Sequence, residues 1–509
     1  MRRRHFLAAA GAAVRTSAAA SVRELPAPAG LGSRLLFLDR SHLRHVSGAV
    51  LVPAPIEKLG LVLSPGSPGD EGGAHSAMGC GIFRTESGYR LYYSGSTKEP
   101  PAFGICVAES PDLLHWTRPG LGQIRVNGKD TNRIRIEGLP EDASVTQPSV
   151  VSLPGGGQRM YFWLHQREPV RRLRYMAADS EDGLRWRIAG GGKPCLVHPH
   201  DIGKWVWDDP AAVRGERRAE DVEERLRIRS NDAAHTYAMP GGGFEIFTVF
   251  PVRNTPDSGR YVAHDNAPFM VRVMARRTSE DGLRFSDPEF IVVPDEEDPW
   301  DQQFYYLTQH RFGSFRIGFL GHYRVHAQTM DIELAYSRDG SRWERPMRGA
   351  WMPRGLPGDS DGGMVYMPNQ LVDMGDHWLA LYTGSSGLHN QPERGRRGIH
   401  AAKIARYRFA GLASTAGLTA RVWTRPFFLN RAAIRVDAAI ASRGVLRAEL
   451  CDALGQPRKG FSFAESIPVE GDSQAHTLRW KTGAFDDYSL HPASLRMEWT
   501  HGVLYGVDC

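Results

Sequence analysis

The sequence has few cysteines and no long hydrophobic run. Its five cysteines lie far apart along 509 residues, and none forms a Cys-x-x-Cys pair or a Cys/His cluster with zinc-site spacing. They allow one disulfide, but the sequence does not indicate which two cysteines would form it. No stretch of about 18 consecutive apolar residues occurs, which excludes a spanning helix of the usual kind. The sequence therefore predicts neither a zinc centre nor a membrane span.

The chain also lacks a strong charge of either sign. Lys+Arg number 63 and Asp+Glu 57, so the formal net charge is only +6. The basic residues are scattered, and the run at 214–229 alternates in sign, as a solvated loop or short helix does. Two glycine runs, 154–157 and 240–243, lack the Gly-Lys-Ser/Thr of a phosphate loop. We expect no nucleic-acid partner and no required cofactor. Whether the fold holds a structural calcium ion is left open by the sequence.

What the sequence does contain is a repeated strand pattern with many turns. Gly 55 and Pro 33 punctuate short apolar runs, which suits strands better than long helices. Aromatic strands recur at 89–96, 160–165, 244–250, 315–322 and 378–385. A second motif, a strand followed by a Ser-x-Asp turn and an aromatic, recurs at 108–116, 178–186, 277–285 and 336–343. The pattern predicts an all-β fold.

The spacing of these motifs favours a propeller. Asp-Gly forms tight turns because glycine tolerates positive φ, and the aromatic that follows can pack between neighbouring sheets. Circular closure removes exposed sheet edges, whereas a run of separate sandwiches, the alternative, keeps them. We therefore expect a five-bladed β-propeller over 31–412. After residue 417 the short alternating strands indicate a C-terminal β-sandwich over 416–509.

Residues 1–30 are expected to be an export signal and linker. Arg3-Arg4-His5-Phe6-Leu7 resembles the twin-arginine signal, an apolar stretch runs to Val14, and Ala18-Ala19-Ala20 offers small residues for cleavage. The alternative is a frayed basic N-terminus. The signal predicts a periplasmic or extracellular protein.

Several motifs together resemble a known group. These are the start Leu35-Leu-Phe-Leu-Asp39, the Ser-x-Asp-Gly-x-x-Trp turns and the tail around Gly460-Phe461 and Arg479-Trp480. They look like bacterial secreted proteins called glycosyl hydrolase family 32-like, in the five-bladed furanosidase-type superfamily of families 32, 43 and 68. The resemblance implies a glycoside hydrolase acting on a furanose-type or related sugar. The invertase segments Trp-x-Asn-Asp-Pro-Asn-Gly, Arg-Asp-Pro and Glu-Cys are absent, so sucrose or fructan hydrolysis by the usual residues is not expected.

Acidic residues precede each aromatic strand, where a propeller would turn them toward its axis. They are Asp70-Glu71, Glu141-Asp142, Asn231-Asp232, Asp298 with Asp301, and Asp359 with Asp361. Cleaving a glycosidic bond takes two carboxyl groups, one to protonate the leaving oxygen and one to attack or to activate water. We expect Glu71, Asp142, Asp232, Asp301 and Asp361 to point into one axial pocket. The alternative is that each acid caps a turn or pairs with an arginine.

The resemblance also implies roles for particular residues. By position, Glu71 would be the base or nucleophile, Asp142 an orienting acid and Asp232 the proton donor. Histidines at the ends of the aromatic strands are candidates for contacts with sugar hydroxyls. The expected substrate-binding residues are His75, His165, His235, Asp301, His322, Asp361 and His389. The expected partner is a carbohydrate, and the oligomeric state is open. Two other functions stay open: a glycan-binding propeller without catalysis, and a scaffold for protein partners.

The export signal gives a direct test. Replacing Arg3 and Arg4 by Lys should keep the protein in the cytoplasm, because the twin-arginine route requires the arginine pair. Immunoblots of cytoplasmic and exported fractions would measure this. Unchanged export of the double variant would contradict the twin-arginine prediction.

Overall fold

The computed structural model is built almost entirely of strands. It describes residues 22–25, 31–75, 81–98, 101–166, 172–197, 230, 233–391, 396–429, 433–483 and 492–509. Within these ranges it contains β-strands, one short 3₁₀ turn, η1 (Gly190–Gly192), and no α-helix. The same ranges hold no helix long and apolar enough to cross a membrane. The all-β prediction is confirmed, while the predicted export segment and Asp232 lie outside the described residues.

The first two sheets follow each other in the chain. The first contains β1 (Arg23–Glu24), β6 (Gly73–His75), β7 (Gly81–Thr85), β8 (Gly88–Ser96) and β9 (Phe103–Ser110). The second contains β12 (Ile136–Glu137), β13 (Ser144–Ser152), β14 (Gln158–Gln166), β15 (Arg172–Ser180), β16 (Trp186–Ile188) and β17 (Leu196–Val197). Between them lies a ribbon of β10 (Arg125–Val126) and β11 (Lys129–Asp130).

Two more sheets continue the series. The third contains β18 (Ala234–Ala238), β19 (Phe244–Arg253), β20 (Met270–Ser279) and β21 (Glu289–Val292). The fourth has nine strands: β22 (Gln302–Phe312), β23 (Phe315–Arg324), β24 (Thr329–Ser337), β25 (Ala350–Met352), β26 (Met364–Tyr366), β27 (Val372–Asp373), β28 (His377–Ser385), β29 (Arg397–Ala405) and β5 (Ile56–Leu63). Two antiparallel meanders share this sheet through a parallel contact at Met330 and Met364.

The sheets form a closed ring, the arrangement of a β-propeller. Their first strands are neighbours, because β13 contacts β18 and β18 contacts β22. The ring closes when β5, from the start of the chain, pairs antiparallel with β29 from Ile56↔Ile404 to Leu63↔Ile399, and β29 contacts β6 of the first sheet. Since two meanders share one sheet, the predicted count of five blades stays a prediction.

The Ser-x-Asp turns predicted from the sequence hold the end of each third strand. In the second sheet, the Ser180 hydroxyl accepts a hydrogen bond from the Gly183 amide at 2.9 Å, and Asp182 accepts from the next two amides at 2.7–2.8 Å. The side chain of Trp186 then donates to the Gly183 carbonyl at 3.1 Å. The turns at 110–116, 279–285 and 337–343 repeat the serine and aspartate contacts.

These turns also join neighbouring sheets. The Tyr92 hydroxyl on β8 donates to the Gly183 carbonyl at 2.8 Å, and the Tyr161 hydroxyl on β14 donates to the Gly282 carbonyl at 2.8 Å. Tyr92 and Tyr161 are fully buried. A tyrosine from the second strand of one sheet thus fixes the turn of the next sheet, which sets the spacing of the ring.

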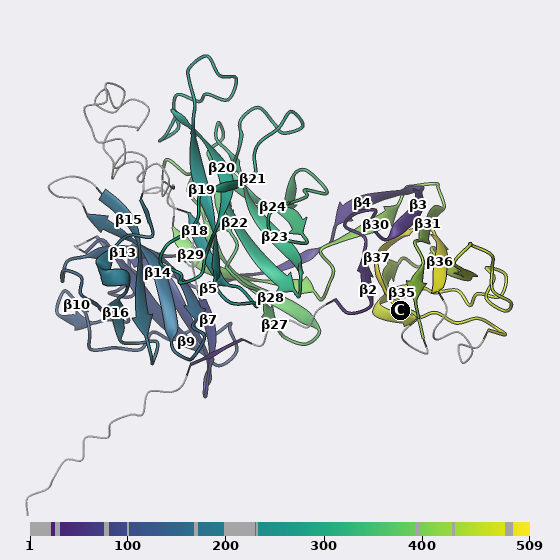
Figure 1. The fold of residues 1–509 in the computed structure, drawn as a ribbon, viewed down its shortest axis with the longest axis horizontal. Coiled ribbons are helices and arrows are strands. Elements are labelled where there is room, and N and C mark those ends of the chain that lie inside the picture. Colours follow the sequence, from purple (N-terminus) through teal and green to yellow (C-terminus); the bar gives the residue numbers. More distant parts are fainter. Residues whose placement is uncertain are drawn as a thin grey trace, which may run out of the picture.

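The second unit lies beside the ring and is built from both ends of the chain (Figure 1). One sheet contains β2 (Arg34–Leu36), β4 (Ala49–Pro53), β30 (Ala410–Ser414), β33 (Arg435–Ile440), β35 (Gly471–Thr477) and β37 (Gly502–Asp508). The other contains β3 (Leu43–Ser47), β31 (Ala420–Thr424), β32 (Phe427–Phe428), β34 (Leu446–Asp452) and β36 (Pro492–Trp499). Buried residues of both sheets, such as Trp499 and Val436, share one core.

The predicted boundary at residue 31 is therefore corrected. Residues 34–53 were assigned to the propeller, yet β2 pairs with β37, β3 with β31 and β4 with β30. Their side chains help cover the core of the second unit, and after β1 the chain returns to the ring only with β5. The sandwich geometry of this unit stays a prediction. Of the cysteines, Cys106, Cys195 and Cys451 are buried free thiols, Cys509 is buried, and Cys80 lies outside the described residues.

Replacing Gly183 by alanine tests the joint between the first two sheets. Gly183 has φ +71°, and a Cβ there would lie 2.4 Å from the Tyr92 hydroxyl oxygen. Gly122 has φ +68° but open space at its Cβ position, so it is a matched control. We expect Gly122→Ala to lower the free energy of unfolding by about 1 kcal/mol through backbone strain alone. In urea unfolding, Gly183→Ala should lower the free energy of unfolding by more than Gly122→Ala does. Equal losses in the two variants would contradict the role of the Tyr92–Gly183 contact in joining the first two sheets.

Candidate functional site on the propeller axis

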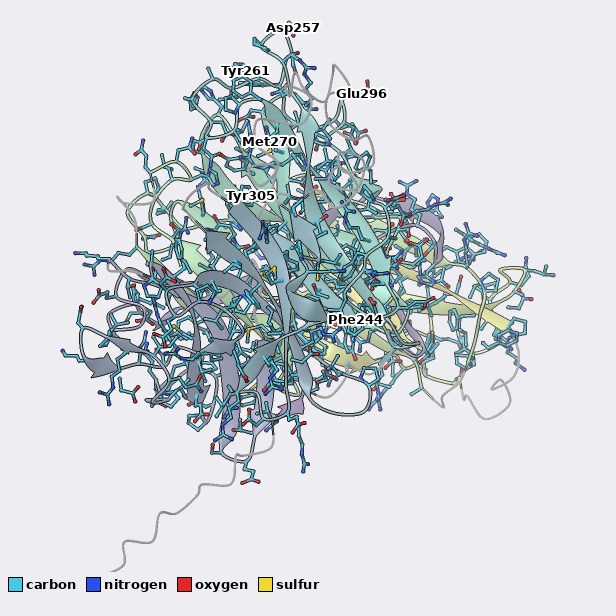
Figure 2. All side chains as sticks on the ribbon, turned by 60° about the vertical axis from the view of Figure 1, so that its left-hand side comes forward. Phe244, Asp257, Tyr261, Met270, Glu296 and Tyr305 are labelled. Atoms are coloured by element: carbon cyan, nitrogen blue, oxygen red, sulfur yellow. The ribbon has the colours of Figure 1, made fainter. Side chains whose placement is uncertain are left out.

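The ring has two different ends. The first strand of each sheet begins at the loop end, where long segments such as 254–269 and 293–301 lie, and it ends at tight hairpins such as 153–157 and 313–314. Figure 2 shows Asp257, Tyr261 and Glu296 at the loop end, with Tyr305 and then Phe244 farther along the molecule. The predicted site residues ahead of each strand belong to the loop end.

A hydrogen-bond network from three sheets crosses the ring. The Asn369 side-chain amide donates to the Ser149 hydroxyl at 2.9 Å, and its carbonyl oxygen lies 2.6 Å from His235 Nδ1. The Ser149 hydroxyl also accepts from the Thr236 amide at 3.0 Å. Ser149 lies on β13 and His235 on β18, while Asn369 follows β26. All four residues are buried, so the network fixes the first strands of three sheets around the axis.

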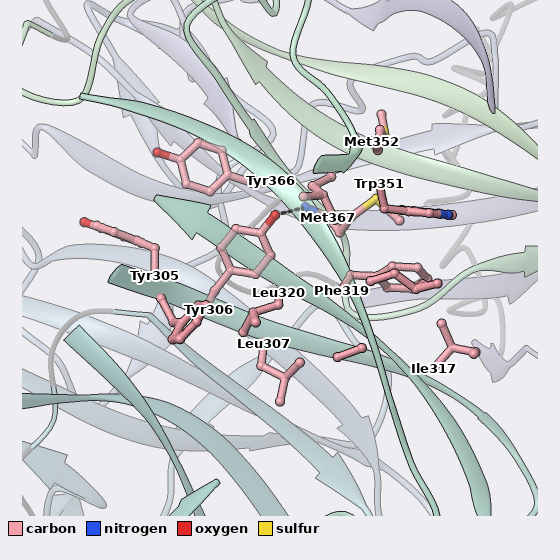
Figure 3. Packing of buried hydrophobic residues seen from close by; sticks show 14 of the residues in the cluster. Tyr305, Tyr306, Leu307, Ile317, Phe319, Leu320, Trp351, Met352, Tyr366 and Met367 are labelled. Atoms are coloured by element: carbon pink, nitrogen blue, oxygen red, sulfur yellow. Dashed lines mark hydrogen bonds between the residues drawn. The ribbon is translucent and has the colours of Figure 1, made fainter. Parts of the chain in front are cut away.

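His235 stands in a rigid, aromatic environment. Its ring meets Tyr306 edge-on, with centroids 6.0 Å apart. The Tyr306 hydroxyl accepts a hydrogen bond from the Met367 amide at 3.1 Å, and Tyr366 packs beside it (Figure 3). Burial lowers the pKa of His235 to about 4. The imidazole is therefore neutral at pH 7, and since Nδ1 donates to the Asn369 carbonyl, Nε2 carries the lone pair.

Two buried hydrogen-bond acceptors near the axis have no partner among the described residues: His235 Nε2 and Gln147 Oε1. Gln147 is a non-glycine residue at φ +58°, inside a bulge of β13 between Thr146 and Ser149. Its backbone amide donates a hydrogen bond to the Ser94 hydroxyl at 2.6 Å, and this bond holds the strained backbone in place. Strain and unpaired polar atoms are costly, and they concentrate where a ligand binds. Both residues precede the Ser149–Thr236 contact in their strands, which places them on its loop-end side.

A cavity of about 560 Å³ opens at the opposite, hairpin end of the axis. Residues from the first strands line it, among them Val150, Thr236, Gln309 and Asn369. Glu24 of β1 reaches its rim, where its carboxylate accepts from the Ser152 amide at 3.2 Å. Asn369 thus separates this cavity from the unpaired acceptors.

The three predicted catalytic acids are not seen together. Glu71 and Asp142 lie in exposed turns, ahead of β6 and β13. Asp232 lies outside the described residues, and of His75 only the backbone is described, paired with Ser94. The buried acid of the first sheet is Asp70, which accepts from the Tyr93 hydroxyl at 2.8 Å and pairs with Arg118 at 2.7 Å. The catalytic assignment stays a prediction.

The other two predicted acids are buried in ion pairs. Asp301 pairs with Arg324 at 2.6 Å and accepts from the His326 amide at 3.2 Å. Asp361 pairs with Lys58 at 2.8 Å and accepts from the Tyr382 hydroxyl at 3.0 Å. Burial pushes the Asp361 pKa up, but the Lys58 and Tyr382 contacts outweigh it and leave that pKa below its usual value. Each acid therefore already has a structural partner.

The remaining predicted histidines occupy three separate places. His165 is half-buried on β14, with its ring tilted against Phe103. His322 on β23 pairs with Glu333 at 3.0 Å. His389 contacts the Tyr305 hydroxyl at 2.9 Å, and burial, followed by the Arg272 charge, lowers its pKa to about 3. Among the predicted binding residues whose side chains are described, His235 alone belongs to the axial network.

The described residues contain no group of three or more His, Cys, Asp or Glu side chains able to hold a metal ion. The acids around the ring are instead engaged by arginine, lysine and tyrosine, as at Asp70, Asp301 and Asp361. These acids therefore already have cationic or hydroxyl partners from the protein itself. The structural calcium ion stays a prediction.

Comparison with known proteins gives similar folds only. No protein-family model matches the chain, and no curated protein matches it. Similar solved structures include a glycoside hydrolase (TM-score 0.45, 15% identity, covering 69% of this chain and 92% of the other). Others are a thermostable family-43 glycoside hydrolase (0.41, 14%, 65% and 88%) and an N-acetylgalactosamine deacetylase from F. plautii in complex with blood group B trisaccharide (0.40, 13%, 76% and 96%). The family 32-like resemblance stays a prediction.

Sequence reasoning missed Gln147, Ser149 and Asn369, because it searched for charged groups. One signal was available. Pro148 lies inside an otherwise apolar strand pattern, and proline within a strand marks an edge or a bulge. That bulge is where Gln147 takes its positive φ.

The buried histidines predict a pH dependence of stability. The folded-state pKa of His235, about 4, lies below the ordinary value of about 6.5, so the unfolded state binds the extra proton between these values. Stability should fall as pH drops through that window, by about 1.4 kcal/mol per pH unit for this histidine. Urea unfolding at pH 7.5, 6 and 5 should show a flatter profile for His235→Gln. His310→Gln should act alike, since burial lowers the His310 pKa to about 3. Slopes equal to the wild type would contradict this.

Proposed function

We propose that the protein is a glycoside hydrolase that binds a sugar of an oligo- or polysaccharide at the loop end of the propeller axis. The observation that carries the proposal is the pair of buried, unpaired acceptors, His235 Nε2 and Gln147 Oε1. Unpaired acceptors call for a ligand that supplies hydrogen-bond donors, and a sugar presents several hydroxyl groups. The neutral imidazole suits an uncharged ligand of this kind, because Nε2 can accept a hydrogen bond from a hydroxyl group while the ring stays uncharged.

The hydrolytic step is assigned to acids at the loop end. Glu71 and Asp142 are exposed ahead of the first strands of two successive sheets, and Asp232 precedes β18 in the sequence. We assign to Glu71 the role of base or nucleophile, to Asp142 that of orienting acid and to Asp232 that of proton donor. A furanose-type sugar is the proposed substrate class.

A second candidate is glycan binding without catalysis. It is favoured by the ion pairs around the ring: Asp301 is held by Arg324, Asp361 by Lys58, and Asp265 by Arg272 at 3.1 Å. At Asp361 and Asp265 the contacts outweigh burial and lower the pKa of the carboxyl group, so each is ionised and is a poor proton donor at neutral pH. Catalysis then rests wholly on Glu71, Asp142 and Asp232.

Activity on a panel of aryl glycosides and polysaccharides tests the proposal. Asp142→Asn and Asp232→Asn should each lower the turnover rate by about 100-fold or more, because the first removes the proposed orienting acid and the second the proposed proton donor. Glu141→Gln is the matched control: Glu141 is the exposed neighbour of Asp142 and pairs with Arg135. It should leave the rate unchanged.

Binding is measured separately on the same panel. His235→Gln should weaken sugar binding, since it removes the imidazole acceptor. Full activity of both aspartate variants would overturn the catalytic assignment. Binding by the wild type without any hydrolysis would leave the glycan-binding function in its place.

A further inference from the structure

A second cavity lies away from the axis, against the fourth sheet. Its volume is about 460 Å³, within the roughly 300–1,000 Å³ of small-molecule sites. It is lined by residues of β23, β24 and β25, and by the segment 297–299 that leads into β22. The axial network is formed instead from β13, β18 and the segment after β26. The cavity is therefore a site of its own.

Three arginines line the cavity, and each is held by carboxylates. Arg324 pairs with Asp301 at 2.6 Å and Arg354 with Asp331 at 2.7 Å, and these two aspartates are only 3% and 13% exposed. Arg348 pairs with Asp295 at 2.8 Å, Glu297 at 3.2 Å and Asp298 at 3.4 Å. The arginine side chains are 32–36% exposed, and Glu297, Asp298 and Asp331 share the cavity wall with them. The ion pairs hold the guanidinium groups, whose remaining donors face the cavity.

A histidine with a fixed orientation completes the polar wall. His322 lines the cavity, and its Nδ1 lies 3.0 Å from a carboxylate oxygen of Glu333. Arg345 donates to both oxygens of Glu333, at 2.7 and 3.0 Å, which fixes that carboxylate. Since Nδ1 donates to Glu333, Nε2 is the nitrogen left for a ligand.

An exposed aromatic residue follows a cavity residue in the chain. Trp300 directly follows Pro299, which lines the cavity, and its side chain is 51% exposed. Its ring is tilted against His326, with centroids 5.7 Å apart. An exposed tryptophan face suits a ligand with one apolar face and several polar groups, which a sugar ring has.

We propose that this cavity binds an acidic sugar, a hexuronate unit of the glycan substrate, as a second subsite. The sugar carboxylate would meet Arg324, Arg348 and Arg354, a hydroxyl would meet His322, and the ring would lie against Trp300. Arginine forks match a carboxylate in shape and charge, which a neutral sugar does not offer. This inference rests on the proposed function, because it takes a glycan as the ligand, and it names the chemistry of one of its sugars.

Calorimetric titration of the full chain with three probes tests the subsite: digalacturonate, neutral galactobiose and sodium sulfate. We expect digalacturonate to bind at least tenfold more tightly than either of the others. Arg354→Gln should weaken its binding at least tenfold. The double variant Asp331→Asn/Arg354→Gln should do the same without leaving an unpaired carboxylate, so loss of fold is separated from loss of the site. Arg338→Gln is the control, because Arg338 pairs with Asp39 outside this cavity.

The outcomes separate this inference from the proposed function. Equal binding of digalacturonate and galactobiose, or of digalacturonate and sulfate, would overturn the acidic-sugar subsite. So would digalacturonate binding that is lost in His235→Gln but kept in Arg354→Gln, since the ligand would then sit on the axis. Digalacturonate binding that depends on Arg354 in a protein that hydrolyses nothing would support the subsite and count against the hydrolase alone.

Discussion

The pairing of β5 with β29 is the constraint on which the rest of the ring depends. It joins residues 56–63, from the start of the chain, to 397–405, so that the last strand of the fourth sheet comes from the opposite end of the ring sequence. Closure brings His235 and Asn369, 134 positions apart in the chain, within 2.6 Å of each other. An open stack of the same sheets would have no axis, and these two buried polar groups would lose their partners. The axial site is therefore a product of closure rather than of any one sheet.

Between neighbouring sheets, the repeated turns keep the spacing that closure requires. Each turn combines a serine, an aspartate and a residue at positive φ, and in two of them a tyrosine from the preceding sheet binds the carbonyl of that residue. Glycine holds this position in three turns, whereas Leu113 takes it with φ +70° in the first. Leu113 is fully buried, so packing there offsets the backbone strain.

The sequence predicted the parts that depend on local chemistry. The Asp-Gly turns and the aromatic strands set the all-β fold, because turn residues and alternating strands leave a periodic signal. The placement of residues 34–53 in the second unit could not be read in this way. Strands such as β4, which pairs with β30, have the same local pattern in either unit, and only the long-range pairing decides between them.

The rule that selected residues ahead of each first strand chose side chains with different surroundings. It selected His235, which lies in the axial network, and also Asp301 and Asp361, which the fold uses in ion pairs. A carboxylate that is buried needs a cation, so acids near an axis are drawn into structural pairs. Burying a neutral amide or imidazole with one atom unpaired costs less free energy than burying an unpaired charge, so such a group can remain unpaired until a ligand binds. Gln147 and His235 are groups of this kind, which is why unpaired neutral acceptors mark this axis more clearly than its acids do.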